Sequence, residues 1–299
     1  MLSGRGSKPG SLGKYFYLFL LPALAVFLTF SILPFAFTVY YSFTDYTDMN
    51  LKNLNFVGLD NYVKALATPL MRKAILNSVI YAFCMTGLQI LVALPLAVLV
   101  NLKLKTRNFL RAVFFFPAVF SALIVGYLWS YILSSSNYGL VNNLLSGLGL
   151  DTFHFFGPKT ALGSVILSQI WQWAGWAMVI FLANLQSVPQ ELYEAADIDG
   201  ASKVKQFFHV TLPLMAPSVK IIAITSLIGG LKVFDIIYAM TKGGPGDTTE
   251  TVMTVMLRHG VSKGFYGVGA AFGVMFFIVV IAISASVTKL MGKWSAAIS

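Results

Sequence analysis

The sequence predicts an all-α membrane protein, and three observations lead to that fold class. Of the 299 residues, 57% are hydrophobic and only 11% are charged, with a mean hydropathy of +0.77, whereas an ordinary globular domain has roughly 25% charged residues. The charges lie between long uncharged stretches, each longer than the roughly 20 residues that a spanning helix needs. The net charge of +10 is dispersed along the chain, which argues against a nucleic-acid binder, and the single cysteine excludes an internal disulfide.

Six membrane-spanning helices are expected, five of them from uncharged stretches and one from an apolar segment interrupted by Lys220, Lys232 and Asp235. The third stretch is longer than one helix requires, and its apolar character ends in the polar run at 134–139. The expected helices cover about 15–43, 74–101, 109–133, 161–186, 214–240 and 266–290. They form one membrane domain over 15–291, between tails at 1–14 and 292–299.

The basic residues orient these helices. With the N-terminus in the cytoplasm, eleven Lys and Arg residues fall on the cytoplasmic side and eight on the outer side, where six acidic residues offset them. Both termini are therefore expected in the cytoplasm. The first apolar run is about twice the length of a signal-peptide core and has no small-x-small cleavage site, so a retained helix is expected there.

The segment 187–213 is more organised than a simple connector. Pro189 opens it, a helix-compatible run follows, Gly200 fits the end of that helix, and a second amphipathic run ends at Pro213. Acidic residues precede the glycine and lysines follow it. A short amphipathic pair of this kind lies in the lipid interface or inserts into a groove of a partner.

The residues themselves favour the second alternative. Glu194-Ala195-Ala196, then Gly200, then a hydrophobe-x-Leu-Pro end at 210–213 resemble the EAA motif of binding-protein-dependent ABC importer permeases, with Val210 where isoleucine is commoner. The segments 17–22, 58–62, 190–194 and 241–245 are similar to the carbohydrate-type family. Within it the chain resembles the first permease subunit of maltose-type and glycerol-phosphate-type importers.

That resemblance implies a type I ABC importer permease fold of six transmembrane helices, in the inner membrane of a bacterial or archaeal cell. It implies a second homologous permease, two copies of a cytoplasmic ABC ATPase and an extracellular or periplasmic solute-binding protein as partners. The cytoplasmic loop would be a coupling helix seated in a groove of the ATPase. The coupling residues would be Glu194, Ala195, Ala196, Asp199, Gly200, Phe207 and Phe208.

The chain is not expected to be an enzyme, and no catalytic residues are assigned. Its Gly-Lys pairs, at 13–14 and 292–293, are not part of a phosphate-binding loop. ATP and Mg²⁺ are therefore expected on the partner ATPases, with no cofactor in this chain. His154, His209 and His259 are far apart in sequence and lack metal-ligand spacing, so no metal site is expected.

The fourth helix carries the first candidate substrate site. Gln169, Gln172, Trp173 and Trp176 fall at i, i+3, i+4 and i+7, which places two amides and two indoles on one helical face near the middle of the membrane. Such residues can serve a structural role, by forming interhelical hydrogen bonds and aromatic packing contacts. They also suit a neutral sugar, because amides bond hydroxyls and indoles cover the ring. The resemblance to maltose-type permeases places these positions in the sugar site.

The fifth helix carries the second candidate site, over 226–235. Adjacent glycines weaken a helix and allow close backbone approach beside a substrate path, and charged side chains here are costly to expose to lipid. Lys232 and Asp235 could pair with each other. The resemblance assigns to the site Ser226, Gly229, Gly230, Val233 and Asp235, with Asp235 suggesting a hydroxyl-rich or cationic ligand.

The expected function is ATP-driven import of a sugar or oligosaccharide delivered by the binding protein, with alternating access driven through the EAA loop. Two other classes fit less well. A secondary transporter would carry ionisable residues on several helices, and a membrane enzyme would show carboxylate or metal-ligand clusters at the interface. Within the family, import of a non-carbohydrate solute such as a polyamine stays open.

Overall fold

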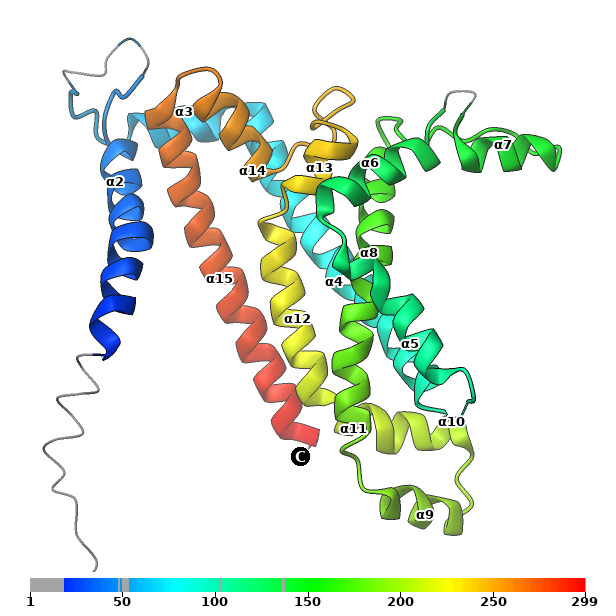
Figure 1. The fold of residues 1–299 in the computed structure, drawn as a ribbon. Helices are drawn as coiled ribbons and strands as arrows, with labels where there is room; N and C mark the ends of the chain where they lie inside the picture. Colours follow the sequence, from blue (N-terminus) through cyan, green and yellow to red (C-terminus); the bar gives the residue numbers. More distant parts are fainter. Residues whose placement is uncertain (1–18, 48, 50–53, 103, 136–137, 299) are drawn as a thin grey trace, which may run out of the picture.

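The structure is a computed structural model that describes residues 19–47, 49, 54–102, 104–135 and 138–298. The predicted tail at 1–14 lies outside these residues. Within them every regular element is a helix, and the β-bridge that the structure records joins Thr44 and Phe56. Long helices form the body of the molecule, and short helices cluster at its two ends (Figure 1).

Four helices are long and apolar enough to cross a membrane in the described part of the chain. They are Phe19–Ser42, which contains the π-helical turn η1 (Leu28–Ile32) and ends as α2 (Leu33–Ser42), α4 (Pro69–Asn101), α8 (Ala161–Leu185) and α15 (Tyr266–Ile298). Two bent pairs raise the number to six if each pair counts as one span. The count agrees with the six predicted helices, although two of those helices are not continuous.

The third predicted span, 109–133, is wrong as a single helix. The chain forms α5 (Arg107–Phe115), the 3-10 turn η2 (Phe116–Val119) and α6 (Ala122–Ile132), with a bend of 100°. Pro117 has no N–H to continue the helical ladder. Phe120 and Ser121 are extended, and the Ser121 hydroxyl accepts a hydrogen bond from the Ile124 N–H as the cap of the new helix.

The fifth predicted span, 214–240, is also divided. Its central helix is α12 (Ala216–Leu231), which is bent by 64° from the helical segment Lys203–Leu214 before it. Lys232 leaves the helical conformation, and a separate helix α13 (Asp235–Met240) follows. Gly229 and Gly230, which were predicted to weaken the helix, therefore lie at the end of α12 and not inside a longer helix.

Two other boundaries move outward. The α4 helix begins at Pro69, five residues before the predicted start, because proline suits the first turn of a helix. The α15 helix continues to Ile298 through most of the predicted tail at 292–299.

The short helices lie at opposite ends of the bundle. At one end lie α3 (Asp60–Ala67), α6, α7 (Leu140–Gly147), α13 and α14 (Val252–Val255), which runs into the π-helical turn η4 (Met256–Val261). At the other end lie α9 (Gln190–Ile198), α10 (Lys203–Gln206), the π-helical turn η3 (Phe207–Thr211) and α11 (Leu212–Leu214). The α15 helix ends on the side of α9 and α10 (Figure 1).

The centre of the bundle is formed by α4, α8 and α12, which pack closely where glycines remove side-chain bulk. A β-carbon on Gly230 of α12 would lie 2.8 Å from the Ala82 Cα of α4, and one on Gly175 of α8 would lie 1.8 Å from the Phe114 carbonyl oxygen of α5. Small residues that let backbones approach are the usual basis of helix packing in membranes. A cavity lies between the three central helices.

Candidate functional site

The cavity has a volume of about 270 Å³ and is lined by residues of α4, α8 and α12 and by Val233 in the break that follows α12. Seven predicted site residues line it: Gln169, Trp173, Trp176, Ser226, Gly229, Gly230 and Val233. Four lining residues were missed from the sequence: Tyr81, Met85, Gln89 and Thr225. Three of these come from α4, whose contribution depends on how it packs against α8.

Two indoles form the aromatic wall. The Trp173 and Trp176 rings meet edge to face, with centroids 6.1 Å apart and an interplanar angle of 88°. Gln169 lies one turn before Trp173, and its Oε1 atom is buried without a hydrogen-bond partner in the described structure. A buried, unbonded carbonyl costs free energy, so this atom has an unused acceptor position at the cavity.

The Gln89 side chain of α4 forms hydrogen bonds with both α8 and α12. Its Nε2 donates to the Trp173 carbonyl at 3.0 Å, and its Oε1 accepts from the Ser226 hydroxyl at 2.7 Å. Both ends of the amide are therefore engaged within the protein. The Ser226 oxygen keeps lone pairs that can accept from a ligand.

Tyr81 adds a second unsatisfied polar group. Its side chain is 1% exposed, and its hydroxyl has no hydrogen-bond partner among the described residues. The cavity therefore offers hydroxyl and amide donors and several oxygen acceptors, while none of its described lining residues is charged. This chemistry suits an uncharged ligand that carries hydroxyl groups.

Two predicted site residues lie elsewhere. Gln172 is buried but does not line the cavity: its Nε2 donates at 2.8 Å to the Phe120 carbonyl, at the bend between α5 and α6. Asp235 is exposed at the start of α13 and is also absent from the lining. In the described structure no ion pair joins it to Lys232, which is itself exposed at the end of α12.

The segment 187–213 folds as the predicted helix, glycine turn and helix. Gly200 follows α9 with φ +72°, a conformation that glycine adopts without strain. The Tyr193 and Thr211 hydroxyls lie 3.0 Å apart and connect α9 to η3. Glu194 and Ala195 are exposed on α9, where a partner could reach them.

A polar cluster closes the turn around Gly200. The Lys203 ammonium donates to both Asp197 carboxylate oxygens at 2.9 and 3.1 Å, and the buried Gln206 amide donates to Asp197 at 2.5 Å. These hydrogen bonds, that of Lys203 first, lower the pKa of Asp197 below its ordinary value. Asp197 was not among the predicted coupling residues, although its charge pattern with Lys203 was visible.

The two predicted coupling phenylalanines differ in their surroundings. Phe208 is 56% exposed, whereas Phe207 packs against the apolar core formed by residues such as Leu185 and Met215. Phe207 thus anchors this segment to the bundle, and Phe208 stays available at the surface.

Comparison with known families identifies the chain. Residues 89–295 match the family described as "Binding-protein-dependent transport system inner membrane component", and these residues include the C-terminal part of α4, the cavity walls on α8 and α12, and the segment 187–213. The chain belongs to this family. The resemblance predicted from the EAA motif is confirmed.

The similarity to known proteins covers nearly the whole length of this inner membrane component. It is 36% identical over 270 residues to the trehalose/maltose transport system permease protein MalF of Thermococcus litoralis, covering 90% of each chain. It is 34% identical over 281 residues to the arabinooligosaccharides transport system permease protein AraP of Bacillus subtilis, covering 93% of this chain and 88% of the relative.

A solved structure confirms the fold. A chain of the bacterial alginate ABC transporter, crystallised with an alginate pentasaccharide-bound periplasmic protein, superposes with a TM-score of 0.80 at 25% identity, covering 94% of this chain and 95% of that chain. The predicted class, a type I ABC importer permease fold, is therefore confirmed.

Proposed function

We propose that this chain is one of the two pore-forming subunits of an ATP-driven importer for a neutral sugar or oligosaccharide. The observation that carries the proposal is the cavity, which combines the Trp173 and Trp176 rings with unsatisfied polar atoms on Gln169 and Tyr81. Indoles cover the C–H faces of a sugar ring, and the polar atoms exchange hydrogen bonds with its hydroxyls. The names of the sugar-transporting relatives support the same substrate class.

The absence of charge from the described cavity lining argues against the polyamine alternative. A polycation would need carboxylates or several aromatic faces to replace its hydration. Asp235, which had suggested a cationic ligand, is exposed outside the cavity. A neutral ligand needs no such partner.

The remaining parts of the machine would be supplied by partners. We assign ATP and Mg²⁺ to two copies of a cytoplasmic ABC ATPase, which would receive α9 and the exposed Phe208. A second homologous permease would complete the pore, and a solute-binding protein would deliver the sugar at the end of the bundle that carries α3 and α7. In this arrangement the segment 187–213 and the end of α15 face the cytoplasm.

Reconstituted transport tests the proposal. The chain is assembled in proteoliposomes with its second permease, its ATPase and its binding protein, and uptake of labelled maltose, trehalose, a short arabinan, an alginate trisaccharide and spermidine is compared. We expect ATP-dependent uptake of one or more neutral sugars, and no ATP hydrolysis by the isolated chain. Uptake of spermidine alone, or of the alginate trisaccharide alone, would refute the neutral-sugar assignment. ATP turnover by the isolated chain would refute its role as a pore-forming subunit that depends on a partner ATPase.

A further inference from the structure

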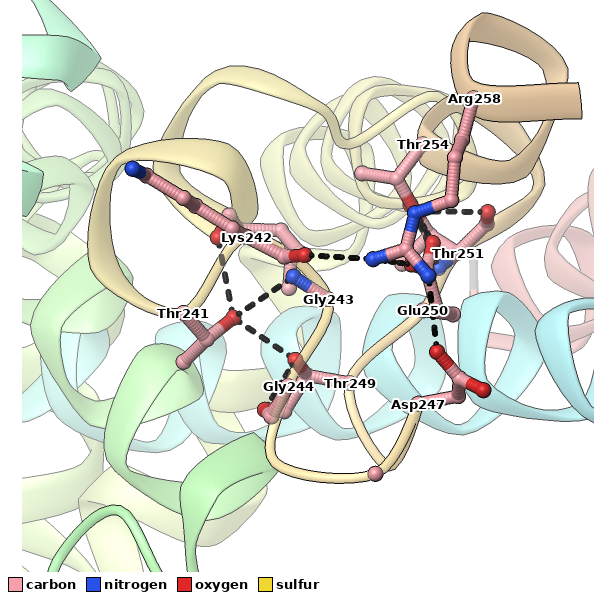
Figure 2. A network of polar contacts seen from close by, with 12 residues as sticks. Thr241, Lys242, Gly243, Gly244, Asp247, Thr249, Glu250, Thr251, Thr254 and Arg258 are labelled. Atoms are coloured by element: carbon pink, nitrogen blue, oxygen red, sulfur yellow. Dashed lines mark hydrogen bonds and ion pairs between the residues drawn. The ribbon is translucent and has the colours of Figure 1, made fainter. Parts of the chain in front are cut away.

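The loop between α13 and α14 is a folded polar structure at the end of the bundle opposite α9 (Figures 1 and 2). The Thr241 and Thr249 hydroxyls lie 2.7 Å apart, and Thr249 also donates to the Gly244 carbonyl at 2.8 Å. Lys242 and Asp247 hold positive φ values of 51° and 60°, which non-glycine residues adopt only where the surroundings determine the backbone. The loop therefore has one defined shape.

A buried carboxylate lies at the centre of this loop. Glu250 is fully buried, its Oε1 lies 2.6 Å from the Arg258 guanidinium, and its Oε2 accepts from the Thr254 hydroxyl (Figure 2). Arg258 also bonds Asp247 at 2.8 Å and the Lys242 carbonyl at 3.0 Å. A buried charge that loses its partner is strongly destabilising, so this cluster holds the two sides of the loop together.

Two side chains of α4 bind main-chain groups of the loop and of the start of α14. The Asn77 amide donates to the Thr248 carbonyl at 3.0 Å and to the Glu250 carbonyl at 2.9 Å. On the next residue, the Ser78 hydroxyl accepts from the Val252 N–H at 3.0 Å. Asn77 lies one helical turn before Tyr81, whose side chain lines the cavity.

A separate contact attaches the loop to the break after α12. The buried Thr251 hydroxyl donates to the Val233 carbonyl at 3.1 Å, and Val233 lines the cavity. The loop is therefore hydrogen-bonded to α4 one turn from Tyr81 and to Val233 after α12. Both Tyr81 and Val233 line the cavity. Any movement that separates α4 from α12 at this end must break one of these contacts.

We propose that Asn77 and Thr251 are positioning residues of an outer latch, which joins α4 to the α12–α13 break and keeps the cavity closed at the end opposite the coupling loop. Glu250 and Arg258 hold the loop in the shape that places both contacts. Release of the latch would open the cavity on the side where substrate enters. This role concerns access and does not depend on which substrate the cavity binds.

Thiol labelling of the assembled importer tests the latch. Cys84 is the only cysteine of this chain, so a Cys84→Ala background carrying Gly229→Cys gives the chain one thiol, at the cavity, where a β-carbon at 229 meets no atom within 4 Å. Labelling is measured on this chain after the subunits are separated. A membrane-impermeant maleimide is added from the outer side of proteoliposomes without ATP. The rate of labelling reports how often the cavity opens outward.

Thr251→Val keeps the shape of the side chain but removes the hydroxyl, which bonds Val233 and also caps α14. Asn77→Ala leaves that cap intact and removes the two bonds to the loop. Each lost hydrogen bond should raise the outside labelling rate roughly two- to tenfold. Thr248→Val is the matched control, because its hydroxyl bonds only the Pro245 carbonyl within the loop, and Thr251→Ser should restore the wild-type rate. Only complexes that remain assembled on gel filtration are labelled, and either latch variant is sufficient for the test.

Higher labelling in Thr251→Val or Asn77→Ala, with Thr248→Val and Thr251→Ser at the wild-type rate, supports the latch. Wild-type labelling in both latch variants would overturn it. An equal rise in Thr248→Val would also overturn it, because general loosening of the loop would then explain the result. Since no substrate is added, the outcome is independent of the sugar assignment.

Discussion

Gly229 and Gly230 are neighbours in the sequence but meet opposite surroundings. A β-carbon would find open space within 4 Å of Gly229, whereas at Gly230 it would lie 2.8 Å from the Cα of Ala82. The first glycine therefore gives room to the cavity, and the second allows α12 to approach α4. A single methyl group added to each distinguishes the two roles.

Gly229→Ala should reduce uptake while leaving the thermal stability of the assembled complex unchanged, because the methyl group enters the cavity and touches no helix. Gly230→Ala should lower stability by about 1–3 kcal/mol, as expected for overpacking at a close contact. Uptake in proteoliposomes and thermal unfolding in detergent measure the two effects. Equal behaviour of the two variants would contradict the assignment.

Tyr81→Phe should weaken transport without disturbing the fold. The hydroxyl has no partner in the described protein, so its removal costs no internal hydrogen bond, while a bond to substrate is lost. One hydrogen bond of about 1 kcal/mol corresponds to a roughly fivefold increase in the substrate concentration for half-maximal uptake. Tyr131→Phe, at an exposed tyrosine of α6, is the control and should transport normally.

Trp173→Ala and Gln172→Ala should fail in different ways. Trp173 lines the cavity, so its loss should impair uptake in complexes that assemble. Gln172 donates a hydrogen bond to the Phe120 carbonyl, and its loss leaves that partly buried group without its donor, at a cost of about 1 kcal/mol. Reduced assembly with normal uptake per assembled complex is expected for Gln172→Ala, and the reverse pattern would exchange the two roles.

Gly200→Val should uncouple ATP hydrolysis from uptake. Gly200 has φ +72°, and a β-branched residue there is strained by about 1–2 kcal/mol. Gly149 supplies a matched control, because it also has φ +72° and open space for a side chain, but lies after α7 at the opposite end of the bundle. Uptake per ATP hydrolysed should fall in Gly200→Val and stay normal in Gly149→Val.

The order of the turn after α9 should depend on pH through Asp197. Because Lys203 and Gln206 hold the pKa of Asp197 below its ordinary value, the carboxylate stabilises the turn above the unfolded pKa of about 3.9. That contribution is lost as the pH falls through the lower, folded pKa of Asp197. Hydrogen exchange of residues 197–206, corrected for the intrinsic effect of pH, should show loss of protection in that acidic range.

Asp197→Asn should show weaker protection already at pH 7 and should remove the acid-dependent step. Asp199→Asn is the control on the same turn, since no side-chain bond of Asp199 crosses the described turn. An acid step that persists in Asp197→Asn would assign the pH dependence to another group.

Part of the site could be predicted because helical periodicity is a local property. Gln169, Trp173 and Trp176 fall within a narrow arc at about 100° per residue, and all three line the cavity. Gln172 lies about 60° from Gln169 on the side away from Trp173, so it points to the bend instead. A spacing of i, i+3 alone does not decide between those two surroundings.

The contribution of α4 could not be obtained in the same way. Tyr81 and Gln89 face the cavity because of how α4 crosses α8 and α12, which depends on residues far away in the sequence, such as Gly230. A buried glutamine inside a long apolar run was nevertheless a usable signal for Gln89. The bend at Ser121 also had a local signal in Pro117, which a search based on uncharged length alone passes over.

Gln172 reaches the Phe120 carbonyl from 52 residues further along the chain, and this separation bears on the order of synthesis. When α5 and α6 first leave the ribosome, Gln172, which donates to the carbonyl at their bend, has not yet been made. Lipid offers no hydrogen-bond donor in its place. We therefore expect the third hydrophobic segment to remain beside the insertion machinery until α8 arrives, so that the two enter the bilayer as one unit.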